Sequence, residues 1–255
     1  MEQDTDIGGG EHRFPETNHS AIVAVRSADG EVRRRAFALI VESYWKPAYK
    51  YVRIKWQVSN EDAKDLIQGF FAAAIEKRYF DSYDSGIASF QTFIRTCLDR
   101  FISNQRKAEH RLKRGGGVEH FSLDFGEAEN ELFLQHGVSE LTPEVFFQRE
   151  WVRSLFGLAL ESLRRQYIEK GNEIYFQLFE LYDLDDGIDE RKEGSKPSYA
   201  SLAEKFDLTT IEVTNYLAAA RRQFRKLVLA RLRELTVSED EFRKEARALL
   251  GVDLN

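Results

Sequence analysis

Apolar residues recur at helical spacing in three successive segments of the first half of the chain. The first segment begins at Arg33, and Pro47 should end or kink its helix because proline lacks a backbone N–H. The second follows Ser59 and Asn60, which supply an N-cap, and the third opens at about Ser89. The periodic apolar positions are Phe37, Ile40, Val41 and Tyr44, then Ala63, Leu66, Ile67, Phe70, Phe71, Ala74 and Ile75, then Phe90, Phe93, Ile94, Cys97, Leu98, Phe101 and Ile102. Three amphipathic helices of this length predict a helical bundle.

A second helical region begins at Thr142, which precedes a proline at the first helical position. Its apolar residues run through Trp151 to Leu163, and a further helix is expected over about 171–184. The first thirty residues are polar and aperiodic, which predicts a flexible tail with a short apolar anchor at residues 22–25. No segment shows a useful length of strand-like alternation, so we expect an all-α chain.

Residues 198–233 carry the most specific local pattern. One helix should stop at Asp207, and Thr209 with Glu212 forms a T-x-x-E capping box that starts the next. Helices joined by so short a turn cross steeply, as in a helix-turn-helix. The second helix would direct outward the base-facing residues Thr210, Glu212, Thr214, Asn215 and Ala218, and then the phosphate-facing residues Arg221, Arg222, Arg225 and Lys226. An ordinary helical hairpin with a solvated basic face is the alternative.

Charge is distributed unevenly along the chain. The net charge of -6 argues against a nucleic-acid partner, but residues 33–114 carry +8 and residues 194–234 carry +4. Between them, residues 115–193 carry -11. Two basic modules separated by an acidic connector are typical of a protein with electrostatic partners, although unevenly solvated helix faces would give the same pattern.

Several classes of protein are excluded by what the sequence lacks. The single cysteine, Cys97, cannot form an intramolecular disulfide, and the five histidines show no metal-ligand spacing. No apolar run approaches the roughly 18 to 20 residues that cross a bilayer, so we expect a cytoplasmic protein without a membrane span. The chain has no two E-x-x-H motifs that could act as a pair, no Ser/His/Asp order and no glycine-rich phosphate loop, so we expect no catalytic residue, no metal site and no cofactor.

Two sequence blocks in a fixed order resemble a known family. NEDAKDLIQGFFAAAIEK followed by FDSYDSGIASFQTFIRTCLDRFISNQRKAEHR resembles region 2 of bacterial RNA polymerase sigma factors of the extracytoplasmic-function (ECF) class, and SYASLAEKFDLTTIEVTNYLAAARRQFRKLV resembles their region 4. The resemblance covers about residues 33–114 and 143–233. It implies an alternative-type sigma factor that binds core RNA polymerase, recognises the -35 and -10 promoter elements and helps to melt promoter DNA.

Together these patterns predict two small helical domains joined by an acidic linker, the second ending in the helix-turn-helix. The expected ranges are a flexible N-terminal tail over 1–32, a region-2-like bundle over 33–114, the acidic linker over 115–142, a region-4-like domain over 143–235 and a C-terminal helical extension over 236–255. In the extension, Ser238 with Glu241 forms a second capping box.

The resemblance assigns residues to three surfaces. It implies that the -10 element, as melted single strand, meets Tyr79, Tyr83, Asp84, Ser85, Arg95, Arg100, Asn104, Gln105 and Arg106. It implies that the duplex -35 element meets Thr210, Thr214, Asn215, Ala218, Arg221, Arg222 and Arg225. Aromatic rings beside hydrogen-bonding side chains suit an unstacked base, and the basic residues suit phosphates.

The third surface would bind the polymerase. In the family, a D-L-x-Q helix docks on basic clamp helices of the largest polymerase subunit, and the corresponding residues here are Asp62, Asp65 and Gln68. The family linker threads through a positively charged polymerase channel, which would hold Asp124, Glu127, Glu129 and Glu131; a plain solvated linker is the alternative. Whether an anti-sigma protein is a further partner stays open.

Two other functions are alternatives. A helix-turn-helix transcriptional regulator with a helical N-terminal domain explains residues 198–233 but leaves the basic, aromatic first module without a role. The second is a helical carboxylate metalloenzyme or hydrolase, and the sequence does not contain the motifs that such chemistry needs. Co-purification with core polymerase would separate the sigma factor from the regulator.

Overall fold

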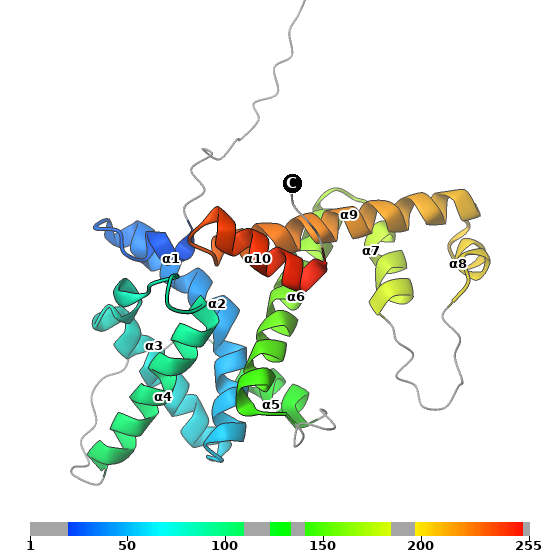
Figure 1. Cartoon of the computed structure of the whole chain (residues 1–255). Helices are drawn as coiled ribbons and strands as arrows, with labels where there is room; N and C mark the ends of the chain where they lie inside the picture. Colours follow the sequence, from blue (N-terminus) through cyan, green and yellow to red (C-terminus); the bar gives the residue numbers. More distant parts are fainter. Residues whose placement is uncertain (1–19, 110–122, 134–140, 185–196, 252–255) are drawn as a thin grey trace, which may run out of the picture.

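The computed structural model describes residues 20–109, 123–133, 141–184 and 197–251, and this part of the chain contains helices and no strand (Figure 1). The sequence therefore predicted the all-α class correctly. The helices are α1 (Ala21–Ala24), α2 (Gly30–Lys55), α3 (Asn60–Glu76), the 3₁₀ turn η1 (Tyr79–Ser82), α4 (Phe90–Glu109), α5 (Phe125–Phe133), α6 (Pro143–Glu169), α7 (Glu173–Phe179) continued by a π-helical turn (Glu180–Leu184), α8 (Tyr199–Phe206), α9 (Thr210–Glu234) and α10 (Glu239–Leu250).

The expected helix starts are confirmed by their caps. The hydroxyl of Ser59 accepts a hydrogen bond from the Asp62 N–H at 3.1 Å, and that of Thr142 accepts from the Val145 N–H at 3.3 Å. The expectation at Pro47 was wrong in one respect, because α2 runs through this residue without ending. Pro47 is buried with its neighbour Ala48, so packing on the core compensates for the backbone hydrogen bond that proline cannot donate.

The larger of two hydrophobic cores lies around α2. It is built from buried residues of α1, α2, α3 and α4, and it also takes in the first half of α6, the end of α9 and α10. Aromatic rings dominate it: Phe37 stacks on Phe80 at 5.6 Å between centroids, and Tyr44 stacks on Trp151 of α6 at 6.2 Å. The expected apolar anchor is confirmed, since Ile22 is completely buried in this core.

The smaller core lies where the sequence predicts a helix-turn-helix. It combines Leu163 of α6 with buried residues of α7, α8 and the first half of α9. Asp207 ends α8 as expected, and it does so in a left-handed conformation, with φ of 53° and ψ of 49°, which aspartate tolerates better than most residues. The capping box at the start of α9 is also confirmed: Thr209 accepts from the Glu212 N–H at 3.2 Å, and the Glu212 carboxylate accepts from the Thr209 N–H at 2.8 Å.

Two long helices, α6 and α9, each contribute to both cores. In Figure 1, α9 runs from the larger body to the α7 and α8 end of the molecule, and α10 folds back beside it. The cores therefore do not coincide with the expected ranges 33–114 and 143–235, because half of α6 and the end of α9 pack on the first module. Residues 110–122, which include the expected end of that module, lie outside the described residues.

In the described part of the acidic connector, residues 125–133 form α5, which packs against α2. Its glutamates pair with a row of α2 cations. Glu129 accepts from Arg53 Nε at 3.1 Å and Nη2 at 2.5 Å, and Glu131 accepts from Lys50 Nζ at 2.5 Å. Lys46 Nζ bridges Glu127 at 3.0 Å and Glu131 at 2.9 Å. This part of the connector is a docked helix, which neither the channel interpretation nor the plain solvated linker anticipated for the free protein.

Candidate nucleic-acid interface

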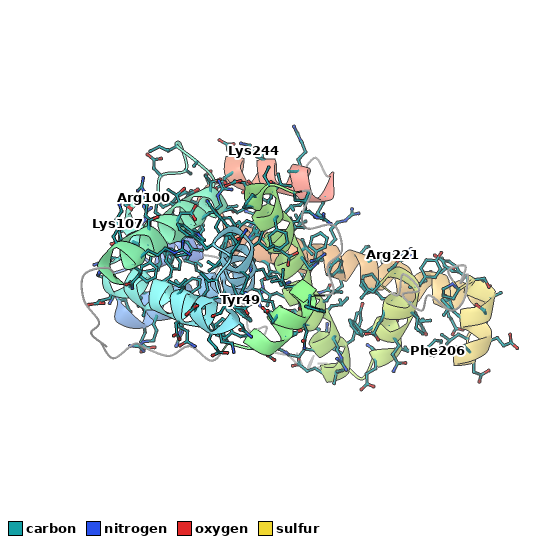
Figure 2. All side chains as sticks on the ribbon, turned by 90° about the horizontal axis from the view of Figure 1, so that it is seen from below. Tyr49, Arg100, Lys107, Phe206, Arg221 and Lys244 are labelled. Carbon is teal, nitrogen blue, oxygen red and sulfur yellow. The ribbon has the colours of Figure 1, made fainter. Side chains whose placement is uncertain are left out.

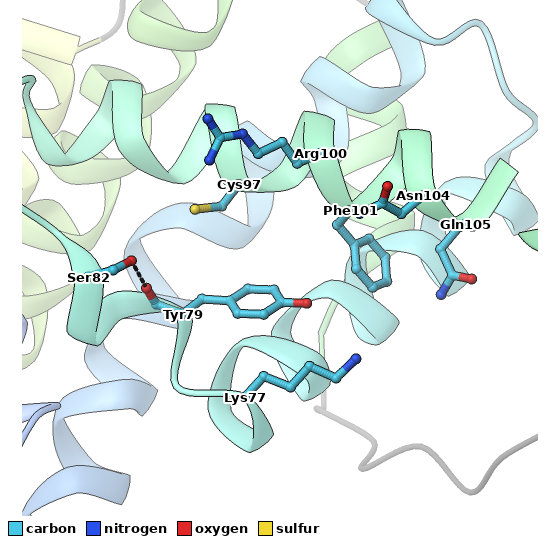
Figure 3. A pocket seen from close by; sticks show the side chains of 8 residues that line it. All are labelled: Lys77, Tyr79, Ser82, Cys97, Arg100, Phe101, Asn104 and Gln105. Carbon is cyan, nitrogen blue, oxygen red and sulfur yellow. Dashed lines mark hydrogen bonds between the residues drawn. The ribbon is translucent and has the colours of Figure 1, made fainter. Parts of the chain in front are cut away.

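A groove of about 470 Å³ lies between η1 and α4 (Figure 3). It forms because Arg78, after the end of α3, adopts a left-handed backbone with φ of 52° and sends the chain into η1. The hydroxyl of Ser82 then donates to the Tyr79 carbonyl at 2.9 Å, which fixes this turn. One wall therefore comes from η1 and the facing wall from α4.

The groove brings together four residues assigned to the -10 element, namely Tyr79, Arg100, Asn104 and Gln105. The other lining residues are Ser82, Lys77, Cys97 and Phe101, and the last three were not predicted from the sequence. For Cys97 and Phe101 a signal existed, because positions 97, 100, 101, 104 and 105 share one helix face at spacings of three and four. Cys97 and Phe101 were grouped with the core because they also follow the apolar period.

Aromatic packing holds the two rings of the groove in place. Phe70 of α3 lies 5.9 Å from the Phe101 ring and 6.4 Å from the Tyr79 ring, between centroids. Gly69 of α3 lies against the Phe101 ring, since a Cβ there would stand 3.4 Å from it, at van der Waals contact. The groove thus has one preformed apolar side, which an unstacked base could contact.

The polar side of the groove carries basic and amide side chains. Arg100, Asn104 and Gln105 are exposed on α4. Burial raises the pKa of the Cys97 thiol to about 11, so it stays protonated at neutral pH. Two basic side chains, two amides and two aromatic rings can bind a phosphate, a base edge and a base face respectively.

The remaining residues assigned to the -10 element lie elsewhere. Tyr83 is only 5% exposed, and its hydroxyl donates to Glu241 of α10 at 2.8 Å. In this conformation its ring is therefore not available to stack on a base. Arg106 covers the Trp56 ring at 4.7 Å and donates to the Trp56 carbonyl at 3.1 Å. Arg95 is half-buried outside the groove, whereas Asp84 and Ser85 are exposed at the tip of the loop.

The residues assigned to the -35 element lie on α9. Thr210, Thr214 and Asn215 are exposed at its start, and Ala218 is half-buried. Ile211 was missed, although it is 72% exposed beside them. Its position could have been inferred, because it falls outside the buried period of α9 set by Val213, Leu217 and Ala220.

The basic residues of α9 are not equivalent. Arg221 pairs with Asp183 through two hydrogen bonds of 2.8 and 2.9 Å, and it covers the Tyr182 ring at 5.3 Å. The Asp183 hydrogen bond raises the pKa of Arg221 above its usual range. Arg221 would therefore have to give up its ion pair with Asp183 to bind a phosphate, whereas Arg222 and Arg225 are already exposed. Figure 2 shows Arg221 and Phe206 at one end of the molecule, and Arg100 and Lys107 at the other.

The residues assigned to polymerase binding lie along α3. Asp62 and Asp65 are exposed, and Gln68 is half-buried. Asp62 belongs to the first turn and accepts a hydrogen bond from the Ser59 hydroxyl at 2.7 Å, so it also serves the helix cap. Asp65 lies beyond that turn, where capping does not explain an acidic residue.

Within the described residues, no cluster of three or more His, Cys, Asp or Glu side chains could bind a metal ion. The helices of the same residues include none that is long and apolar enough to cross a membrane. Comparison of the chain with protein-family models, with curated proteins and with solved structures finds no match. The function must therefore be argued from the chain itself.

Proposed function

We propose that this protein is a sigma factor similar to those of the ECF class. In this proposal it binds core RNA polymerase, recognises the -35 and -10 promoter elements and helps to open the DNA between them. The observation that carries the proposal is the groove beside α4, where Tyr79, Arg100, Asn104 and Gln105 meet around a preformed aromatic wall.

A melted strand would enter this groove with one base unstacked. The face of the base would contact Tyr79 or Phe101, and the amides of Asn104 and Gln105 would exchange hydrogen bonds with its edge. Arg100 and Lys77 would meet the flanking phosphates. Holding an extruded base lowers the free energy of the open duplex, which is what promoter melting requires.

Duplex recognition would fall to α9. Its first turns project Thr210, Thr214 and Asn215, side chains that can hydrogen-bond base edges in a major groove. Ile211 adds an exposed apolar side chain, which is the complement of a thymine methyl group. Arg222 and Arg225 follow on the same helix, so they would fix its register by binding phosphates.

Docking on polymerase would use the acidic face of α3, because Asp65 is exposed where a basic partner can reach it. Helix α5 would have to leave α2 before its glutamates could enter a polymerase channel, since Lys46, Lys50 and Arg53 now neutralise them. The channel interpretation thus applies to a polymerase-bound state rather than to the free conformation.

Size-exclusion chromatography of the full chain mixed with bacterial core RNA polymerase tests this proposal. We expect the chain to elute with the polymerase at about equal molar ratio. We also expect it to lower the affinity of the polymerase for nonspecific competitor DNA. If the chain elutes alone yet binds duplex DNA without polymerase, it is a helix-turn-helix regulator, which is the second candidate, and the sigma-factor proposal is wrong.

A further inference from the structure

Helix α10 packs on the larger core through a narrow apolar face. Phe242 and Ala246 are its buried residues, and the guanidinium of Arg233 on α9 covers the Phe242 ring at 4.0 Å. The opposite face is polar and carries Lys244, which points away from the body in Figure 2. Only these two side chains of α10 are fully buried, and Leu249 and Leu250 pack on the same core while remaining partly exposed.

The first turn of α10 reaches the loop that follows η1, beside the groove. Glu241 accepts from the Tyr83 hydroxyl at 2.8 Å with one carboxylate oxygen and from the Val237 N–H at 2.8 Å with the other. The Tyr83 ring packs edge-on against Phe90, 4.9 Å away between centroids. The residue after η1 is thereby turned inward, toward the core.

The same loop is held from the other end of the chain. Arg26, which follows α1, donates to the Tyr83 carbonyl at 2.5 Å. Both the hydroxyl and the carbonyl of Tyr83 are therefore bound by segments that lie outside the α2 to α4 bundle. Restraint by two separate segments fixes a loop that a base-reading surface would need to rearrange.

We infer that α10 is an autoinhibitory helix, which keeps Tyr83 in the core and must release it before the loop between η1 and α4 can bind an unpaired base. This inference rests on the proposed function. Tyr83 and Ser82 are neighbours, and Ser82 already lines the groove, so an outward turn of the released Tyr83 would add a ring beside Tyr79.

Two glutamates at the α10 contact also favour its separation from the core. Glu241 and Glu245 lie one turn apart on the face of α10 that lines a small cavity with Tyr44 and Trp151. Like charges at this spacing oppose each other, and burial followed by the nearby Glu241 raises the pKa of Glu245. A helix seated with this repulsion leaves its site more readily than one seated by apolar contacts alone.

Hydrogen exchange and DNA binding of full-length variants test the inference. The double variant Glu241→Ala with Phe242→Ala removes the hydrogen bond to Tyr83 and the buried ring of α10, and Asp240→Ala is the matched control because it removes a neighbouring, exposed carboxylate. The probe is a fluorescein-labelled, mixed-sequence, 20-nucleotide single strand. We expect amides of residues 79–89 to exchange about tenfold faster in the double variant and its affinity for the probe to rise several-fold, while the control behaves as wild type.

Each other outcome has a defined meaning. Unchanged exchange of residues 79–89, with faster exchange in α10 itself, overturns the inference whatever the probe does. A freed loop without a gain in affinity over a wild type that binds the probe overturns it as well. If residues 79–89 exchange faster but neither the wild type nor the double variant binds the probe, the result supports the restraint of the loop by α10. It then contradicts the proposed function instead.

Tyr83→Phe provides a second variant that keeps the ring and its packing. Loss of the hydroxyl alone should increase amide exchange in α10 while circular dichroism stays unchanged. Unaltered exchange in α10 would show that the Tyr83 hydrogen bond does not hold the helix, and would overturn the inference independently of the double variant.

Discussion

Truncating Glu150 should destabilise the whole chain, because this residue lies at a buried ion pair between α2 and α6. Lys50 is 1% exposed and Glu150 is 3% exposed, and Lys50 Nζ lies 2.6 Å from Glu150 Oε2. Removing one partner of such a pair leaves a buried charge uncompensated, which costs about 3–5 kcal/mol. Glu131 lies 2.5 Å from the same ammonium and is 32% exposed, so it compensates part of the Lys50 charge. We therefore expect Glu150→Ala to lose about 3 kcal/mol, the lower end of that range.

Urea unfolding followed by circular dichroism measures this loss. The control is Glu161→Ala, an exposed carboxylate on the same helix, which should change the free energy of unfolding by less than about 0.5 kcal/mol. Lys50→Met combined with Glu150→Leu should recover most of the loss, since an apolar pair of similar volume replaces the ions. A loss below about 1 kcal/mol for Glu150→Ala, or a double variant as unstable as the single one, would refute the argument from buried charge.

Three further predictions concern the surfaces of the molecule. Arg222→Ala should weaken binding to all -35 variants alike and reduce the salt slope by about one unit, whereas Asn215→Ala should alter sequence preference; the reverse result in an anisotropy titration would show that α9 is oriented differently. Asp65→Arg should abolish polymerase binding in a pull-down while circular dichroism stays helical, and retained binding would exclude α3 as the docking face. Hydrogen bonds from Arg53 lower the pKa of Glu129, and those from Lys50 and Lys46 lower that of Glu131 although its burial acts in the opposite direction. The docking of α5 is therefore stabilised above about pH 4.3 and weakens as the pH falls further, so amides of α5 should lose exchange protection below that value; protection unchanged at pH 3 would contradict the ion-pair assignment.

The local structure was largely predictable from the sequence, because it is set by nearby residues. The helix starts at Ser59, Thr142 and Thr209 follow from capping hydroxyls, and the left-handed turn at Asp207 follows from a tolerance of aspartate. Pro47 is the exception, and tertiary burial explains it. Capping chemistry acts within four residues, whereas the fate of a proline depends on what packs against it.

The arrangement of helices was not predictable in the same way. The docking of α5 depends on pairs such as Arg53 with Glu129, which lie far apart in the sequence and carry no local pattern. The placement of α6 against α2 depends likewise on Lys50 and Glu150. The groove was half predictable, since helical spacing groups Arg100 with Asn104, but the inward turn of Tyr83 depends on α10, which is 158 positions away at Glu241.

Run-off transcription tests the central claim most directly. Core RNA polymerase with the full-length chain is given a pool of random promoter fragments, and the transcribed templates are sequenced. The account predicts transcripts that core polymerase alone does not produce, from templates sharing two spaced elements. It also predicts that Arg100→Ala, in the groove, lowers the yield about tenfold, whereas Arg106→Ala, on the same helix but bound to Trp56, lowers it far less. Yields no higher than those of core polymerase alone would contradict the assignment of this protein as a sigma factor.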